Sequence, residues 1–395
     1  MQSDKNRATS FWQTNHCTYE DPDSLDSWAT NTVAQLFDQA DSLNFGLFFS
    51  FDHASAAYFT SPSQYTGYLK PFLTRPSYFK YNGRSIVSTF GAETVSNDEW
   101  TTFKAAVGDV LVIPGFYQAT PRPDFFSDRA AIDGVFNWNA WPAAAAGKAT
   151  VSDVDDLTYL SAAHSAGKLF ILGISPLQFK PIDAGQNWYL RGEDNLEVRL
   201  EQALALQSDI IELQTWNDAG ESHYIGNSWE EPIAGTPILN YTREYDHKGY
   251  WKIIAPFIQA WKRGDTTTAG MVPTDEDVQG AFWHHTLTVN ADCGADGFGK
   301  PRDVGNVEDV VSGAVLVAKG RTGLVAVVIN DDKELDRVEL SEGYNKFKLG
   351  GLGAGKVRIE VVDGSTVIAS ASGPLEVSTS ATLCNYNLQV VGFSG

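Results

Sequence analysis

The stretch FGLFFSFD, residues 45–52, decides the fold, because it is an apolar run of strand length that ends in an acid. An amphipathic helix is predicted just before it, over residues 31–43. The same helix-and-strand unit recurs along the chain. Strand-like runs lie at residues 85–90, 109–114, 134–137, 168–174 and 210–216, with helical patterns at 97–107, 153–166, 193–207 and 249–262. Near-continuous apolar strands that alternate with amphipathic helices indicate a parallel sheet that helices cover.

Polar and aromatic residues follow directly after these strands, which favours a β/α barrel. Asp52, Trp138, Ser175, Asn217 and Asp218 lie just past strand ends, where a β/α barrel carries its active site. A doubly wound sheet is the rival fold, but no glycine-rich phosphate loop follows the first strand. Six strands are visible, two fewer than a closed barrel has, so either the chain begins partway into the barrel or the sheet stays open. The prediction is an α/β fold, a (β/α)8 TIM-type barrel that is incomplete at its N-terminus.

The character of the chain changes after a small polar hinge at residues 265–270. Short alternating or β-branched runs follow at residues 281–289, 313–317, 324–329, 346–349, 357–362, 366–370 and 388–391, with Gly and Asp or Asn between them. This pattern is typical of a compact antiparallel β domain. We therefore predict an irregular segment at 1–28, a barrel domain at 29–265 and a C-terminal all-β sandwich-like domain at 266–395.

The composition argues against several classes of partner. The 395 residues carry a formal net charge of −20, and such a surface repels polyphosphates, so nucleic acid is not an expected partner. A neutral polymer such as a glucan would feel no such repulsion. No apolar stretch reaches the roughly 18 residues of a membrane span, so we expect no membrane contact. Residues 1–19 lack the basic and apolar regions of a signal peptide. We expect the protein to be a monomer.

The cysteines and histidines show no metal-binding pattern. Cys17, Cys293 and Cys384 form no C-x-x-C pair. In an oxidising compartment Cys293 and Cys384 can form a disulfide, and three unrelated thiols are the alternative. No histidine has the H-E-x-x-H spacing of a zinc site, and His284 and His285 are adjacent in a predicted strand, which points them to opposite faces. We therefore expect neither a metal nor another cofactor.

The densest group of polar residues is TWNDAGESHYIG, residues 215–226, at the end of the strand at 210–216. Asp218 and Glu221 lie three residues apart in it, with only Ala219 and Gly220 between them. Glycoside hydrolysis needs two carboxyls, one protonated to release the leaving oxygen and one ionised to activate water or attack the sugar. Two neighbouring acids repel, which helps to keep one of them protonated. The structural alternative is a helix N-terminus, with Asp218 as the cap and Glu221 at the third position.

Further candidates follow other strands. Asp52 ends the first strand, where a carboxyl is costly unless it is paired or functional, and an N-cap is the structural alternative. Asp133 opens the strand at 134–137 and is interpreted as structural. Trp138 and Trp141 follow that strand, and each can stack on a sugar ring or fill the core.

Several segments match, in order, the pattern of a known family. They are ISP at 174–176, NWYLRGED at 187–194 and WNDAGESHYIG at 216–226, with shorter matches at 49–52, 88–90, 133–138, 140–142 and 247–250. The block at 216–226 is long and specific. On these motifs the chain resembles glycoside hydrolase family 71, the fungal α-1,3-glucanases or mutanases, over about residues 29–265, and its terminal β domain has the expected size and place.

The resemblance implies an extracellular or cell-wall enzyme that needs no metal and cleaves α-1,3-glucan in an endo-acting, inverting reaction. It implies Glu221 as the general acid, Asp218 as the base that directs water and Asp52 as a third essential acid. It also implies that the substrate is bound by Trp138, Trp141, Trp216, Asn217, His223, Tyr224 and His247.

The chain departs from the family pattern at its N-terminus. Family members begin with a secretion signal and two further barrel strands, and residues 1–28 show neither. We therefore expect a shortened barrel whose cleft lacks one wall. Two other functions stay open: a glucan-binding relative without turnover, and a hydrolase of another glucan.

Overall fold

The computed structural model describes residues 27–54, 59–226, 228–274 and 276–395. Cys17 and all of the predicted irregular segment before residue 27 therefore lie outside the described residues. The chain forms two compact units. The first holds the described residues up to Asn139 together with Asp153–Gly173 and Ser208–Leu213, and the second holds Ala140–Ser152, Ile174–Gln207 and Gln214–Gly395.

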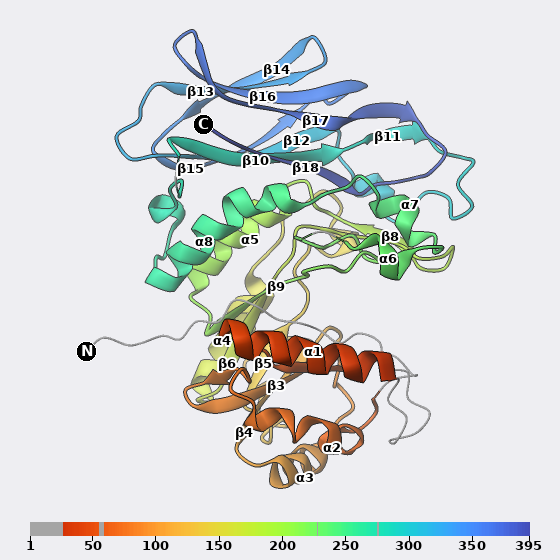
Figure 1. Cartoon of the computed structure of the whole chain (residues 1–395), viewed down its shortest axis with the longest axis vertical. Coiled ribbons are helices and arrows are strands. Elements are labelled where there is room, and N and C mark those ends of the chain that lie inside the picture. The colour runs from red at the N-terminus through yellow and green to blue at the C-terminus, as the bar shows by residue number, and fades with distance from the viewer. Residues whose placement is uncertain (1–26, 55–58, 227, 275) are drawn as a thin grey trace. The chain divides into compact units, whose positions relative to one another are not determined.

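The first unit is built on a sheet whose strands follow one another in chain order (Figure 1). The order is β1-β3-β4-β5-β6-β9, and neighbours from β1 to β6 pair in parallel. The bounds are β1 (Phe49–Asp52), β3 (Arg84–Phe90), β4 (Val110–Phe116), β5 (Gly134–Asn137), β6 (Leu169–Ile174) and β9 (Ile210–Leu213), with β2 (Lys80–Tyr81) antiparallel on β3. A doubly wound sheet reverses its strand order, whereas this order never reverses. The six predicted strands and the α/β class are confirmed.

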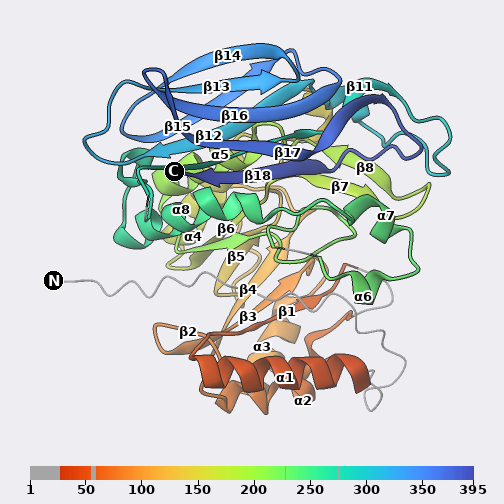
Figure 2. The same ribbon diagram turned by 45° about the horizontal axis from the view of Figure 1, so that its top comes forward.

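The helices of the first unit are α1 (Ser27–Leu43), α2 (Thr66–Leu69), α3 (Asn97–Val107) and α4 (Val154–Ser165), with 3-10 turns η1 (Pro62–Gln64) and η2 (Phe72–Thr74). Of these helices, α3 has its predicted bounds and α4 lies within one residue of them, whereas α1 begins before residue 31 and the short α2 has no predicted counterpart. Figure 2 shows α1 beside β1, and the ring of Phe37 lies 5.6 Å from that of Phe49. A capping box between Ser96 and Glu99 starts α3. The helix stops at Gly108, whose φ of 98° is unfavourable for residues with a side chain.

The second unit contains a β-sandwich. One sheet has the order β15-β12-β10-β18 and the other β11-β17-β16-β13-β14. The paired strands of these two sheets are antiparallel except β11 with β17, so the fully antiparallel domain that we predicted is wrong at this one pair. Phe282 and Val315 of the first sheet share one buried cluster with Val328 and Ile359 of the second. The bounds are β10 (Val278–His285), β11 (Leu287–Asp292), β12 (Val310–Val317), β13 (Leu324–Asn330), β14 (Lys333–Leu340), β15 (Gly343–Gly350), β16 (Gly355–Asp363), β17 (Thr366–Ser380) and β18 (Leu388–Ser394).

Strand β14 has no counterpart in the predicted pattern. Its sequence, KELDRVEL, is highly charged, and most of its side chains are exposed. It pairs only with β13 at the edge of its sheet, and charged side chains are how natural proteins protect an edge strand from further pairing. A hydrophobic pattern cannot detect such a strand.

Helices and a hairpin complete the second unit. They are β7 (Gln178–Pro181), β8 (Asn187–Leu190), α5 (Asn195–Leu206), α6 (Glu230–Ile233), α7 (Ile238–Thr242) and α8 (Trp251–Arg263), with 3-10 turns η3 (Ala144–Ala146), η4 (Lys248–Tyr250), η5 (Thr268–Gly270) and η6 (Val304–Asn306). Helix α8 packs against α5 and against β10, β12 and β18 of the sandwich. The predicted boundary at residue 265 between the barrel domain and the β domain stays a prediction. Helices α5 and α8 belong to the same compact unit as the sandwich. No helix of the described segments has the length and apolarity to cross a bilayer.

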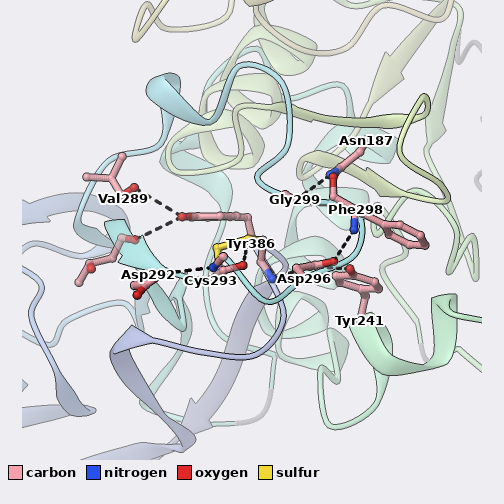
Figure 3. Close-up of a disulfide and its surroundings, with 12 residues drawn as sticks. Asn187, Tyr241, Val289, Asp292, Cys293, Asp296, Phe298, Gly299 and Tyr386 are labelled. Carbon is pink, nitrogen blue, oxygen red and sulfur yellow. Dashed lines mark hydrogen bonds between the residues drawn. A yellow bond between two sulfur atoms is a disulfide. The ribbon is translucent and has the colours of Figure 1, made fainter.

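A disulfide between Cys293 and Cys384 joins the segment after β11 to the segment before β18 (Figure 3). Of the two alternatives that the sequence left open, the structure supports this pair. Asp296 lies beside it, and one of its oxygens accepts hydrogen bonds of 2.7 Å from the backbone N–H of Cys384 and from the hydroxyl of Tyr241. The other oxygen accepts from the backbone N–H of Phe298 at 2.8 Å. The disulfide and Asp296 together fix the loop that leads from β11 toward β12.

Removal of the disulfide should destabilise the protein. The cysteines are 91 residues apart, and closing a loop of this length restricts the unfolded chain, so Cys293→Ser/Cys384→Ser should lower the free energy of unfolding by about 2–5 kcal/mol. Denaturant unfolding measures this. Dithiothreitol should lower the midpoint of the wild type but leave that of the double variant unchanged, and equal wild-type and variant midpoints without reductant would contradict the prediction.

Candidate active site

The loop after β9 carries the two acids and folds back on itself. The backbone N–H of Thr215 donates to the carbonyl of His223 at 2.9 Å, and that of Ile225 donates to the carbonyl of Thr215 at 2.8 Å. Asp218 and Glu221 therefore lie at the tip of a closed loop. No helix begins here, since the next one is α6 at Glu230. The alternative of a helix N-terminus is wrong, although one oxygen of Asp218 does accept from the backbone N–H of Glu221 at 3.2 Å.

The two carboxyls share a buried histidine. His223 Nε2 lies 3.4 Å from Asp218 Oδ2 and 3.7 Å from Glu221 Oε2. One oxygen of each carboxyl and this nitrogen all lie within 4.8 Å of one another. The side chain of His223 is fully buried, whereas those of Asp218 and Glu221 are 28% and 19% exposed. The acids are therefore open to solvent on one side and supported by His223 on the other.

The β7–β8 hairpin supplies two further polar side chains that sequence reasoning missed. Lys180 Nζ donates to Glu221 Oε1 at 2.7 Å, and Gln178 Nε2 donates to Glu221 Oε2. The backbone N–H of Phe179 donates to the carbonyl of Glu221 at 3.0 Å. The alternation of Gln178, Phe179 and Lys180 was a signal for a half-buried strand. Nothing in that pattern could identify a partner about 40 residues away.

The charges around Asp218 favour its ionised form. Burial alone would raise its pKa, but the hydrogen bond and charge of His223, the backbone N–H of Glu221 and the charge of Lys180 hold this pKa below the ordinary value of 3.8. At neutral pH Asp218 is therefore a carboxylate.

Asp218, Glu221 and His223 each offer one atom that could bind a metal ion. The ammonium of Lys180 already donates to Glu221, and its positive charge opposes a second cation at the same oxygens. The arrangement suits hydrogen bonding to a polar substrate better than it suits a metal.

Of the predicted sugar-binding residues in this unit, Trp216 is the most accessible. Its side chain is 44% exposed, and its ring meets that of Trp251 edge to face at 5.7 Å. A Cβ added at Gly226 would lie 3.2 Å from the indole of Trp216. The glycine therefore leaves room for the indole in its observed position. Asn217 is partly exposed. Trp141 is 9% exposed, and its ring lies 5.6 Å from that of His223.

The structure corrects the predicted roles of Tyr224 and His247. Both are fully buried, and their rings stack at 4.1 Å. The nitrogens of His247 lie 2.7 Å and 2.9 Å from the carbonyls of Tyr224 and Leu388. Neither residue can line a sugar cleft, because no part of it reaches the surface. His223 is also fully buried, and its Nε2 lies against the carboxyls of Asp218 and Glu221.

Asp52 and Trp138 belong to the first unit. Asp52 ends β1, is 8% exposed and accepts a hydrogen bond from the backbone N–H of Ala54 at 2.8 Å. Whether it caps a helix depends on residues 55–58, which lie outside the described part of the chain. Trp138 follows β5, is 7% exposed and lies 4.6 Å from the ring of Phe90. Asp133 pairs with Lys104 at 2.7 Å, which confirms its structural role.

Comparison with known proteins agrees with these features. Residues 23–395 match the pattern of Glycosyl hydrolase family 71. Glucan endo-1,3-alpha-glucosidase agn1 of Schizosaccharomyces pombe is 28% identical over 92% of this chain and 84% of that protein. A mutanase of Penicillium rubens is 28% identical over 94% of this chain and 80% of that protein, and the ascus wall endo-1,3-alpha-glucanase of S. pombe is 24% identical over 92% and 86%. Since the family pattern spans nearly the whole sequence, this chain belongs to glycosyl hydrolase family 71.

Proposed function

We propose that this protein hydrolyses α-1,3-glucan, with Asp218 and Glu221 as its catalytic pair. The observation that carries the proposal is the position of the two acids. Their oxygens lie within 4.8 Å of each other on a closed loop, partly exposed above a buried histidine. The names of the relatives, two α-1,3-glucanases and a mutanase, support the substrate. They also support an extracellular or cell-wall location.

Asp218 is the base in this mechanism. As a carboxylate with a lowered pKa, it takes a proton from water while the water oxygen attacks the anomeric carbon. The bond from this carbon to the glycosidic oxygen breaks, and Glu221 gives its proton to the leaving oxygen. Lys180 and Gln178 each donate to one oxygen of Glu221. Each oxygen keeps a second lone pair, which can carry the acid proton while both hydrogen bonds remain.

Inversion of configuration stays a prediction. Inverting enzymes separate their carboxyls by roughly 6.5–9.5 Å and retaining enzymes by about 5–5.5 Å. The distance within 4.8 Å between the nearest oxygens of Asp218 and Glu221 does not favour inversion. Proton NMR of the first anomer released from an α-glucan decides between the two outcomes.

Trp216, Asn217 and Trp141 are the proposed sugar contacts of this loop region, with Trp216 as the stacking surface because of its exposure. Asp52 as a third essential acid and Trp138 as a further sugar contact complete the proposal, since both follow strands at the end where barrel enzymes place their sites. In this view the six-stranded sheet is part of a TIM-type barrel, and the enzyme acts as a monomer.

Replacement of either acid should abolish turnover. Asp218→Asn and Glu221→Gln should each lower kcat on α-1,3-glucan by about 10²–10⁴-fold, the usual contribution of a positioned acid or base. Reducing-sugar release measures this. Glu231→Gln, an exposed acid on α6, is the matched control and should keep wild-type activity.

The same assay separates the other two functions. A wild type that binds insoluble α-1,3-glucan but releases no sugar would be a binding protein, and release from a different glucan alone would change the substrate. A residual activity near the wild-type level in both acid variants would contradict the assignment of the pair.

The pH profile of kcat/KM should show the effect of His223 on the pKa of Asp218. The hydrogen bond and charge of His223 lower the pKa of Asp218, so His223→Phe should raise that pKa. Because the base must be ionised, the acid limb of kcat/KM should then move to higher pH, and activity at low pH should fall most. His223→Gln retains a donor and should move the limb less. An acid limb that stays in place in His223→Phe would contradict this role.

A further inference from the structure

Two side chains on one face of the β7–β8 hairpin, Gln178 and Lys180, contact the carboxyl of Glu221, and a third, Trp188, contacts both of them. Lys180 lies directly opposite Trp188 in the strand register, and Gln178 precedes Lys180 by two residues, which puts it on the same face. On its other side Trp188 forms a backbone bridge with Arg302. The guanidinium of Arg302 lies 5.4 Å and the ammonium of Lys180 lies 4.8 Å from the centre of the Trp188 ring, within cation–π range.

The chemistry of the groups fixes the direction of every hydrogen bond in this cluster. The indole N–H of Trp188 lies 3.1 Å from the Gln178 side chain, and an indole N–H can only donate. The Gln178 atom that faces Trp188 must therefore be the amide oxygen. This leaves the amide NH₂ to face Glu221, to which it donates. The indole donor and the Glu221 acceptor thus favour the same orientation of the amide, and loss of the indole N–H removes the hydrogen bond that holds the amide oxygen.

The hairpin itself is held by the loop that the disulfide fixes. The side-chain amide of Asn187 donates to the carbonyls of Phe298 and Gly299 at 3.2 Å and 3.0 Å. The backbone N–H of Arg302 donates to Asn187, and that of Tyr189 donates to Arg302, both at 3.0 Å. Trp188 thus lies in the chain between Asn187 and Tyr189, which both bond to the loop after β11; Figure 3 shows Asn187 beside Phe298 and Gly299.

We infer that Trp188 is a positioning residue for the reaction, because it orients Gln178 and supports Lys180, and these two side chains hold Glu221 in place. The inference rests on the proposed catalytic role of Glu221. Displacement of a catalytic group by about 1 Å can cost on the order of 10²-fold in rate. Loss of one of two side-chain hydrogen bonds to Glu221 should therefore lower kcat without weakening substrate binding.

The competing interpretation is that Trp188 stacks on a sugar ring of the substrate. The two roles predict opposite results for Trp188→Phe, which keeps an aromatic ring and removes the N–H. A positioning residue loses kcat, by about tenfold, with KM unchanged. A stacking residue keeps both constants in Trp188→Phe and raises KM only in Trp188→Ala.

The test is a double-mutant cycle with Gln178. Since Trp188 is expected to act through the amide of Gln178, Trp188→Phe should lower kcat in the wild type but have little further effect in a Gln178→Ala background. If the loss of kcat in the double variant equals the product of the losses in the two single variants, the residues act independently and the inference is overturned. Trp283→Phe is the matched control: it removes a buried indole N–H that donates to the backbone of Gly192 and Glu193, and it should leave kcat near the wild-type value.

A structural measurement separates this inference from the proposed function. In a crystal structure of Trp188→Phe, the Gln178 side chain should change its position and the Glu221 carboxyl should shift, while Trp283→Phe should leave both as in the wild type. An unchanged Gln178–Glu221 contact in Trp188→Phe would overturn the positioning role whether or not the enzyme is active. A wild type that releases no sugar from any glucan would overturn the proposed function instead.

Discussion

The fold of residues 214–226 depends on three backbone hydrogen bonds between its two ends, from Thr215 to His223, from Ile225 to Thr215 and from Gly226 to Trp216. They close a loop that contains no helix or strand. They also bring the carboxyls of Asp218 and Glu221 to the same side of this loop. Two carboxylates this close repel in a partly desolvated place. The compensation comes from the buried ring of His223 below them and from Lys180 beside them. Together with the amide of Gln178, the site sets two acids against three nitrogen groups.

Buried charged groups join the segment after the β7–β8 hairpin to the C-terminal part of the chain. Arg191, almost fully buried, pairs with Asp194 at 2.9 Å and with Glu308 at 2.6 Å. Burial alone would raise the pKa of Glu193, but His285 of β10 and the charge of Arg191 hold it at about 2. The segment 187–194, one of the motifs on which the family resemblance rests, therefore joins the hairpin that holds Glu221 to the sandwich.

The sequence predicted the elements of both regions well because their cores are apolar and periodic. The strands at β3, β5 and β6 and the helix α3 lie within one residue of their predicted ends. The strand at β1 is shorter than predicted, since the run at residues 45–48 contributes only an isolated bridge from Leu47 to Tyr78. The predicted opposite orientation of His284 and His285 is also confirmed. His284 stacks on Phe282 of the sandwich core, whereas His285 contacts Tyr189.

The sequence by itself determined the class of fold, the order of strands and helices along the chain, and the acidic motif at 218 and 221. Apolar periodicity and a long motif are local properties of the chain, which is why a sequence reveals them. Only the tertiary structure decided which residues serve that motif. Tyr224 and His247 look like sugar contacts in the sequence yet are buried against one another. Gln178 and Lys180 look like ordinary hairpin residues yet contact Glu221, and Trp188 donates to Gln178. The physical reason is that burial and hydrogen-bond partners are set by contacts between segments far apart in the chain, which no local pattern records.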